Sequence, residues 1–170
     1  PLNDVRVRKA LALAIDRNHI TKNVNKCGAI PAYSFTPPGS NGYFPDTKIG
    51  TDLELAKSLL AEAGYPNGEG FPELEILFNT SEGHRQIALA IQQMWKKNLG
   101  INVILDNMDW KVYLSREMIG DFQISRAGWI GDYEDPNTFL DLMRPNRGNN
   151  KTGWENMEYD ALVEKANTIN

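Results

Sequence analysis

The chain has 170 residues with 18 basic and 22 acidic side chains, which gives a formal net charge of −4, and 41% of its residues are apolar. A chain of this length can bury one solid core, and mild acidity without a basic stretch argues against a nucleic-acid partner. The apolar runs are too short to cross a bilayer, and one cysteine with two histidines can form neither an internal disulfide nor a tetrahedral zinc site.

The first third of the chain is predicted to be helical and then loop-like. Apolar residues recur at helical spacing over 5–15 behind a capping residue at Asn3 or Asp4, and Asp16 starts a second short helix. From 28 to 50, prolines and glycines alternate with aromatic residues. This composition predicts an ordered loop that packs on a core.

The remaining chain alternates between helices and strands, which predicts an α/β fold. A capping box of Thr51 and Glu54 opens a helix that Gly64 ends. Hydrophobic periodicity and turn residues then indicate, in order, strand 74–79, helix 81–100, strand 101–105, helix 109–118, strand 121–127, a helix from Pro136, and a helix over 159–169. Strands joined by helices favour right-handed crossovers and a mainly parallel or mixed sheet.

Common enzyme motifs are missing from the sequence: H-E-x-x-H, G-x-S-x-G, a Walker loop, and a dinucleotide-binding glycine pattern after a strand. An acidic group remains at Asp132, Glu134 and Asp135. Paired carboxylates can perform glycosidase chemistry or bind calcium, although the spacing fits no EF-hand and no second carboxylate is placed across a cleft. A solvated loop is the ordinary alternative for such a group.

The position of the acidic group favours a ligand-binding role. Arg126, Trp129, Asp132 and Tyr133 lie at or just after the end of the strand predicted at 121–127. In open α/β sheets, ligands bind at the carboxyl ends of the strands. An aspartate for an amine and an arginine for a carboxylate could together hold a zwitterion.

Four stretches resemble bacterial family 5 extracellular solute-binding proteins, the oligopeptide and dipeptide receptors of ABC importers. In chain order they are residues 4–17 (DVRVRKALALAIDR), residues 56–70 with LLAEAGYPNG, residues 128–136 (GWIGDYEDP), and residues 153–160 with GWEN followed by Tyr159 and Asp160. They cover the chain almost from end to end. Because all four occur in the family's order, the resemblance is specific.

The resemblance implies a periplasmic-binding-protein-like lobe of the class II type, with a mixed sheet flanked by helices. Residues 1–170 are then expected to form a single ligand-binding lobe without an internal boundary, as part of a longer two-lobed receptor. The chain starts without Met, signal peptide or lipid-bearing cysteine. Cys27 lies at the end of a predicted helix and is expected to be a small packed residue.

The resemblance also implies five ligand-binding residues. Asp132 matches the aspartate that binds the α-ammonium of a peptide, and Trp129 and Trp110 match tryptophans of side-chain pockets. Arg126 and His84 match positions offered to the peptide carboxylate. Alternatives remain open: Trp110 as a core residue, His84 as a helix-cap residue, and Arg126 as a partner of an internal aspartate, Asp121 or Asp132.

The implied function is capture of oligopeptides and their delivery to membrane permease subunits, without catalysis, cofactor, metal or nucleic acid. The receptor is expected to be monomeric and extracytoplasmic, in the periplasm or on the cell surface as a lipoprotein. A nickel, heme or oligosaccharide receptor of the same family is one alternative. A hydrolase that uses Asp132 with Glu134 is a remote one, because carboxylates so close in one loop rarely reach across a scissile bond.

Overall fold

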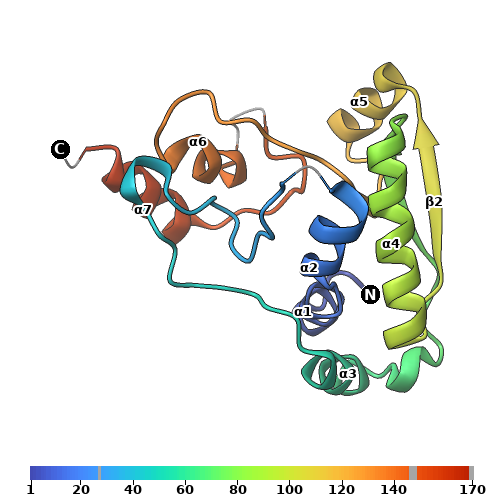
Figure 1. Cartoon of the computed structure of the whole chain (residues 1–170). Coiled ribbons are helices and arrows are strands. Elements are labelled where there is room, and N and C mark those ends of the chain that lie inside the picture. The colour runs from blue at the N-terminus through green and yellow to red at the C-terminus, as the bar shows by residue number, and fades with distance from the viewer. Residues whose placement is uncertain (27, 146–148, 169–170) are drawn as a thin grey trace.

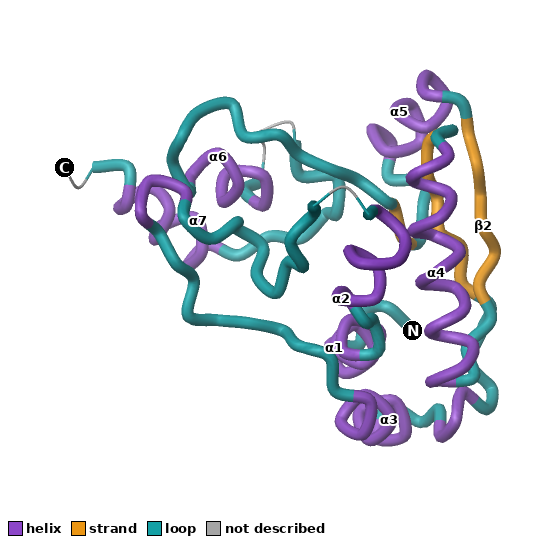
Figure 2. The backbone as a smooth tube through the Cα atoms, viewed as in Figure 1, coloured by secondary structure: helices purple, strands orange, loops and turns teal. Residues whose placement is uncertain are grey.

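The computed structural model describes residues 1–26, 28–145 and 149–168. The predicted packing of Cys27 lies outside the described residues. Figure 1 shows an α/β body, built from the sheet and helices α1 to α5, beside a smaller group that contains α6 and α7. The segment between α2 and α3 runs from the body toward this smaller group and back (Figure 2).

Seven α-helices lie in the described part of the chain. They are α1 (Val5–Leu13), α2 (Arg17–His19), α3 (Leu53–Glu62), α4 (Glu82–Leu99), α5 (Trp110–Ile119), α6 (Asn137–Leu140) and α7 (Met157–Ala166). A π-helical turn, η1 (Ile20–Asn25), continues α2, and 3-10 turns occur at η2 (Ser40–Gly42), η3 (Pro66–Gly68) and η4 (Asp141–Met143). None of the described helices combines the length and the apolar character needed to cross a membrane.

The sheet contains β1 (Leu74–Asn79), β2 (Val103–Met108) and β3 (Ile124–Ser125) in the order β2-β1-β3. Both strand pairs are parallel, which confirms the predicted α/β lobe and decides for a parallel arrangement of the described strands. Helix α4 connects β1 to β2, and α5 connects β2 to β3. The carboxyl ends of the three strands therefore lie at one edge of the sheet.

The core lies on the side of the sheet that faces α4, α1 and α3. Its buried members come from these helices, from β1 and β2, and from the turn before β2: Val7, Ala10, Leu11, Ala14, Ala56, Leu60, Leu74, Ile76, Trp95, Leu99, Ile101 and Val103. Figure 1 shows α4 lying along the sheet, with α1 and α3 beside it. Alternate residues of each strand supply this face, as the period of two in the sequence predicts.

Two strands differ in extent from the prediction, because turn residues next to them are used by the preceding helices. Ile101 was expected to start a strand, but its N–H donates to Trp95 O and closes α4, so β2 starts at Val103. Asp121 was expected in the third strand, but its N–H donates to Arg116 O and closes α5. Strand β3 comprises only Ile124 and Ser125, so the predicted strand residues 121–123 and 126–127 lie outside it, and β2 extends to Met108, three residues beyond its predicted end.

The ends of two helices also differ from the prediction. Helix α3 is capped by Asp52, whose carboxylate accepts a 3.0 Å hydrogen bond from Leu55 N, so the predicted capping box with Thr51 is wrong. Thr51 instead donates its hydroxyl proton to Ile15 O at 2.8 Å. The last helix begins two residues before Tyr159, behind an Asn156 cap, and ends at Ala166.

Candidate functional site

Three of the predicted ligand residues follow the three parallel strands at the same edge of the sheet. His84 lies in the first turn of α4 after β1, Trp110 is the first residue of α5 after β2, and Arg126 follows β3 directly. The Arg126 N–H donates to Leu77 O at 2.8 Å, which extends the pairing of β3 with β1 by one residue. The carboxyl ends of the strands thus bring these side chains to one edge.

His84 and Arg126 lie within electrostatic reach of each other at this edge. His84 Nδ1 lies 2.8 Å from Asn79 Oδ1, at the end of β1. Burial and the positive charge of Arg126 lower the pKa of His84 below 6.5. Burial also lowers the pKa of Arg126, and no carboxylate in the described part of the chain pairs with its guanidinium. The predicted alternative partner Asp121 pairs with Arg116 instead, at 2.9 Å.

Trp110 lies on the surface of this edge and stacks on a buried tyrosine. Its side chain is 57% exposed, which rules out the core alternative, and its ring lies 5.5 Å from that of Tyr113 at an interplanar angle of 18°. Tyr113 is 3% exposed, and its hydroxyl donates to Arg126 O at 3.1 Å. Burial raises the pKa of Tyr113 to about 12, so the hydroxyl remains a donor at neutral pH.

Two further polar side chains surround the Tyr113 hydroxyl. Ser125 Oγ lies 3.3 Å from this hydroxyl and donates to Glu117 Oε1 at 2.5 Å. A hydroxyl has a single proton, so the shorter bond to the carboxylate is the one that uses it. The Tyr113 proton is then available for Arg126 O.

Asp132 and Trp129 lie on the segment that runs from β3 toward α6. Trp129 is 39% exposed and the Asp132 side chain is exposed, with no ion pair to the described residues. The main chain of Asp132 is fixed, because its N–H donates to Thr138 Oγ1 at 3.0 Å and Thr138 is 4% exposed. A Cβ on the preceding Gly131 would lie only 3.1 Å from Thr138 Cγ2, so this segment packs closely on α6.

The structure therefore brings the predicted residues together in two groups. His84, Trp110 and Arg126 share the edge of the sheet, whereas Trp129 and Asp132 lie farther along the segment. Within the described part of the chain, Asp132 and Arg126 form no ion pair or hydrogen bond with each other. The sequence prediction missed Tyr113 and Thr138. Tyr113 lies three residues after Trp110 on the same helix, which was the only signal available for it.

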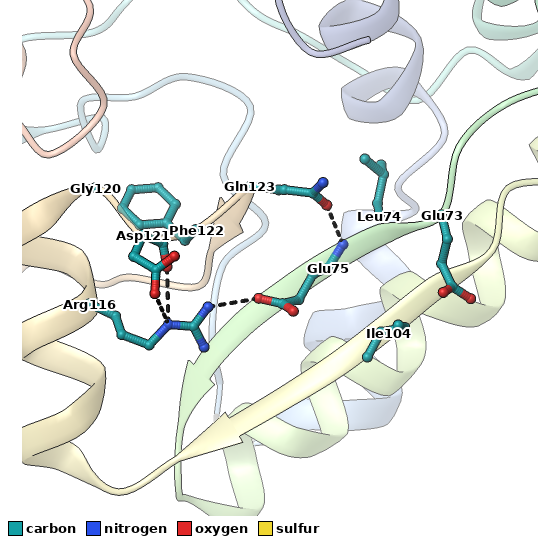
Figure 3. A pocket seen from close by; sticks show the side chains of 9 residues that line it. All are labelled: Glu73, Leu74, Glu75, Ile104, Arg116, Gly120, Asp121, Phe122 and Gln123. Carbon is teal, nitrogen blue, oxygen red and sulfur yellow. Dashed lines mark hydrogen bonds and ion pairs between the residues drawn. The ribbon is translucent and has the colours of Figure 1, made fainter.

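A hollow of about 460 Å³ lies at the opposite end of the sheet (Figure 3). Arg116 crosses it and is bound by Glu75 at 3.0 Å, by Asp121 at 2.9 Å and by Asp106. These bonds hold the pKa of Arg116 above its usual range. Because its cation is already neutralised and none of the five predicted residues lines it, we do not assign the ligand to this hollow.

Comparison with known proteins gives a consistent result. The family described as bacterial extracellular solute-binding proteins, family 5 Middle, matches residues 1–151. The oligopeptide-binding protein OppA of Bacillus subtilis is 42% identical over 99% of this chain and 32% of its own length. The probable deoxycholate-binding periplasmic protein YgiS of Escherichia coli is 37% identical, again over 99% of this chain and 32% of its own length.

The structural comparison agrees with these relatives. The crystal structure of a periplasmic oligopeptide-binding protein of Borrelia burgdorferi has a TM-score of 0.91 and 44% identity, and the match covers 100% of this chain and 34% of that one. The chain thus spans about a third of the length of the proteins that it matches.

Proposed function

Because this chain belongs to family 5 of the bacterial extracellular solute-binding proteins, we propose that the protein captures oligopeptides for an ABC importer. In this role residues 1–170 form one ligand-binding lobe that closes with a second lobe over the peptide. The permease subunits in the membrane then recognise the closed state. The family and the relatives are periplasmic or extracellular binding proteins; we further propose a monomeric receptor that is held at the cell surface as a lipoprotein where no periplasm exists.

The observation that carries the proposal is the Arg126 guanidinium. It is partly buried, and the described residues offer it no carboxylate partner. A buried cation without a counter-ion is costly, so this position suits a ligand that brings its own carboxylate. His84 lies close enough to lose basicity to Arg126. A ligand carboxylate between the two would favour the protonated ring, whose Nε2–H would then be a second donor to that carboxylate while Nδ1 stays with Asn79 Oδ1.

Asp132 is proposed to bind the other end of the peptide. Its exposed carboxylate is on the same segment as Arg126, and its main chain is held by Thr138. An aspartate whose main chain is fixed presents its carboxylate from a defined position, and a carboxylate makes a strong charge-assisted hydrogen bond to an ammonium group. Trp110 and Trp129, both exposed, would then cover the peptide side chains between the two charged ends.

Recognition of the peptide is proposed to depend mainly on its two charged ends and its main chain. An extended ligand that pairs through main-chain hydrogen bonds tolerates many side chains, and water can fill what a pocket leaves empty. The ligand is released unchanged, so we propose binding without catalysis. The similarity to a probable deoxycholate-binding protein favours one competitor, a carboxylate ligand without an amine.

Isothermal titration calorimetry on the natural gene product, with whatever sequence flanks these 170 residues, tests this function. Tri- to pentapeptides should bind, and Asp132→Ala should weaken binding by about tenfold or more, because a charge-assisted bond is lost. Glu134→Ala, an exposed neighbouring carboxylate, is the matched control and should leave the affinity unchanged. Equal binding by wild type and Asp132→Ala would exclude the amine contact.

Two additional ligand arms separate the alternatives. If deoxycholate binds and free peptides do not, the protein is a receptor for an amine-free carboxylate. Chromatography of the peptide after incubation should return it intact. Hydrolysis that disappears in Asp132→Asn would show that the protein is an enzyme.

A further inference from the structure

We infer that Tyr113 and Thr138 are separate positioning residues for the two charged ends of segment 126–132, Tyr113 for Arg126 and Thr138 for Asp132. This inference rests on the proposed function, because it assigns the carboxylate end of the ligand to Arg126 and the ammonium end to Asp132. Neither hydroxyl is proposed to touch the ligand. Each acts through one main-chain hydrogen bond.

Tyr113 holds the main chain of Arg126 from the side of α5. The Arg126 N–H is bound to Leu77 O at 2.8 Å and its carbonyl accepts from the Tyr113 hydroxyl at 3.1 Å, so both polar groups of this peptide unit are fixed. The Tyr113 ring is buried and stacks on Trp110. The direction in which the guanidinium leaves the sheet is therefore set by the helix that also carries Trp110.

Thr138 holds the main chain of Asp132 from the side of α6. Its buried hydroxyl accepts the Asp132 N–H at 3.0 Å, and its methyl group lies so close to Gly131 that a side chain there would force a shift. The hydroxyl and the methyl group of Thr138 together fix the position of the Asp132 main chain against α6. A serine at this position would keep the hydrogen bond and lose only the methyl contact.

The two anchors belong to different parts of the fold. Tyr113 lies on α5 in the α/β body, whereas Thr138 lies on α6 in the neighbouring group, and segment 126–132 runs between these parts (Figure 1). Loss of one hydroxyl should therefore disturb one end of the ligand and leave the other end bound. A general loss of stability would instead affect both ends together.

Calorimetry with trialanine in three forms, free, N-acetylated and C-amidated, measures each end separately in the natural gene product. The ratio of the Kd of the amide to that of the free peptide reports the carboxylate end, and the corresponding ratio for the acetylated peptide reports the amine end. Tyr113→Phe should lower the first ratio about fivefold and leave the second unchanged, as expected for one lost hydrogen bond. Thr138→Val should lower the second ratio about fivefold and leave the first unchanged, and Thr138→Ser should keep both ratios at the wild-type values.

Matched controls remove equivalent hydroxyls elsewhere. Thr51→Val deletes a hydroxyl that donates to Ile15 O at 2.8 Å, and Thr21→Val deletes the one that donates to Asn18 O at 3.2 Å; neither variant should change the two ratios. Ser125→Ala is a second test of the Tyr113 anchor, because Glu117 then loses its serine donor and competes more strongly with Arg126 O for the tyrosine proton. It should lower only the carboxylate ratio.

The outcomes distinguish the inference from the function on which it rests. If the wild type distinguishes both blocked ends but Tyr113→Phe and Thr138→Val change both ratios equally, or change neither, the positioning roles are wrong and the function stands. If the wild type binds no form of trialanine, the proposed function fails and the inference fails with it. Ratios within one protein do not depend on the fraction that is folded.

Discussion

The indole of Trp95 donates a 2.9 Å hydrogen bond to the main-chain carbonyl of Leu11. This carbonyl lies in the last turn of α1, where the usual helical donor, Ile15 N, is bound to Ala12 O instead. Arg17 donates to the same region, to Ala12 O and Ile15 O. Helix α1 is therefore ended by side chains, and one of them comes from α4, 84 residues away along the chain.

Trp95→Phe should lower the free energy of unfolding by about 2–3 kcal/mol, because it leaves a cavity and a buried carbonyl without a donor. Urea unfolding followed by circular dichroism measures this loss. Trp154→Phe, at a tryptophan that is 41% exposed, is the control and should cost less than about 1 kcal/mol. Equal losses of unfolding free energy in the two variants would show that the hydrogen bond to Leu11 does not contribute measurably to stability.

His84 should make stability depend on pH. Its pKa is lowered in the folded state by burial and by Arg126, so folding favours the neutral ring. The stability linked to this shift is therefore fully present above pH 6.5, the ordinary pKa of a histidine. It is lost as the pH falls through the lower pKa of His84 in the folded state. Between pH 7.5 and 5, wild type should lose more stability than His84→Gln in urea unfolding. Parallel curves for the two proteins would contradict this coupling.

Arg116 should stabilise the fold by keeping three carboxylates from facing one another. Without it, Glu75, Asp106 and Asp121 would repel at neutral pH. Arg116→Met should cost about 1–2 kcal/mol at pH 7, and the deficit should shrink toward pH 4 as carboxylates become protonated.

The matched control for Arg116 is another arginine of a described helix. Arg85 is exposed and lies 4.0 Å from Glu82, so Arg85→Met should change stability by less than about 0.5 kcal/mol. Guanidinium chloride would screen these charges, so urea is the appropriate denaturant. A deficit for Arg116→Met that does not depend on pH would assign the loss to packing.

Gly100 should tolerate no side chain, because it combines a left-handed backbone with a close contact. Its φ is +74°, and a Cβ would lie 2.2 Å from Asn67 O. Gly100→Ala is expected to cost about 3 kcal/mol or more, whereas Gly120→Ala, at φ +71° with no atom within 4 Å, should cost about 1–2 kcal/mol. Thermal and urea unfolding of both variants separate the contact from the backbone strain. Similar losses would show that the turn before β2 can move away.

The elements that the sequence predicted well are those whose periodicity reports burial. In β1, Leu74 and Ile76 lie in the core as the alternation predicts, Leu77 on the other face is buried as well, and the predicted bounds 74–79 are confirmed. The errors lie at ends, where Ile101 and Asp121 close the preceding helices through hydrogen bonds to residues several positions back. Such turn geometry leaves no hydrophobic period to detect.

The candidate site shows the same division. The rule that ligands bind at the carboxyl ends of parallel strands pointed to Arg126, whereas His84 and Trp110 were predicted from the resemblance to the family. Tyr113 and Thr138 bond to the main chain of Arg126 and of Asp132, that is, to atoms that any residue carries. Because any residue can supply a main-chain partner, no pair of residue types in the sequence marks such a hydrogen bond.

The anchoring of segment 126–132 at two helices has a consequence for engineering. Helix α6 is itself fixed to α7, since the Tyr159 hydroxyl donates to Leu140 O, and Arg144, which follows η4, bonds to Glu164 at 2.8 Å. The separation of Asp132 from Arg126 thus depends on where α6 and α7, packed on each other, hold the far end of segment 126–132. A designer who wants to accept longer or shorter ligands would change that packing, and would leave every residue that faces the ligand as it is.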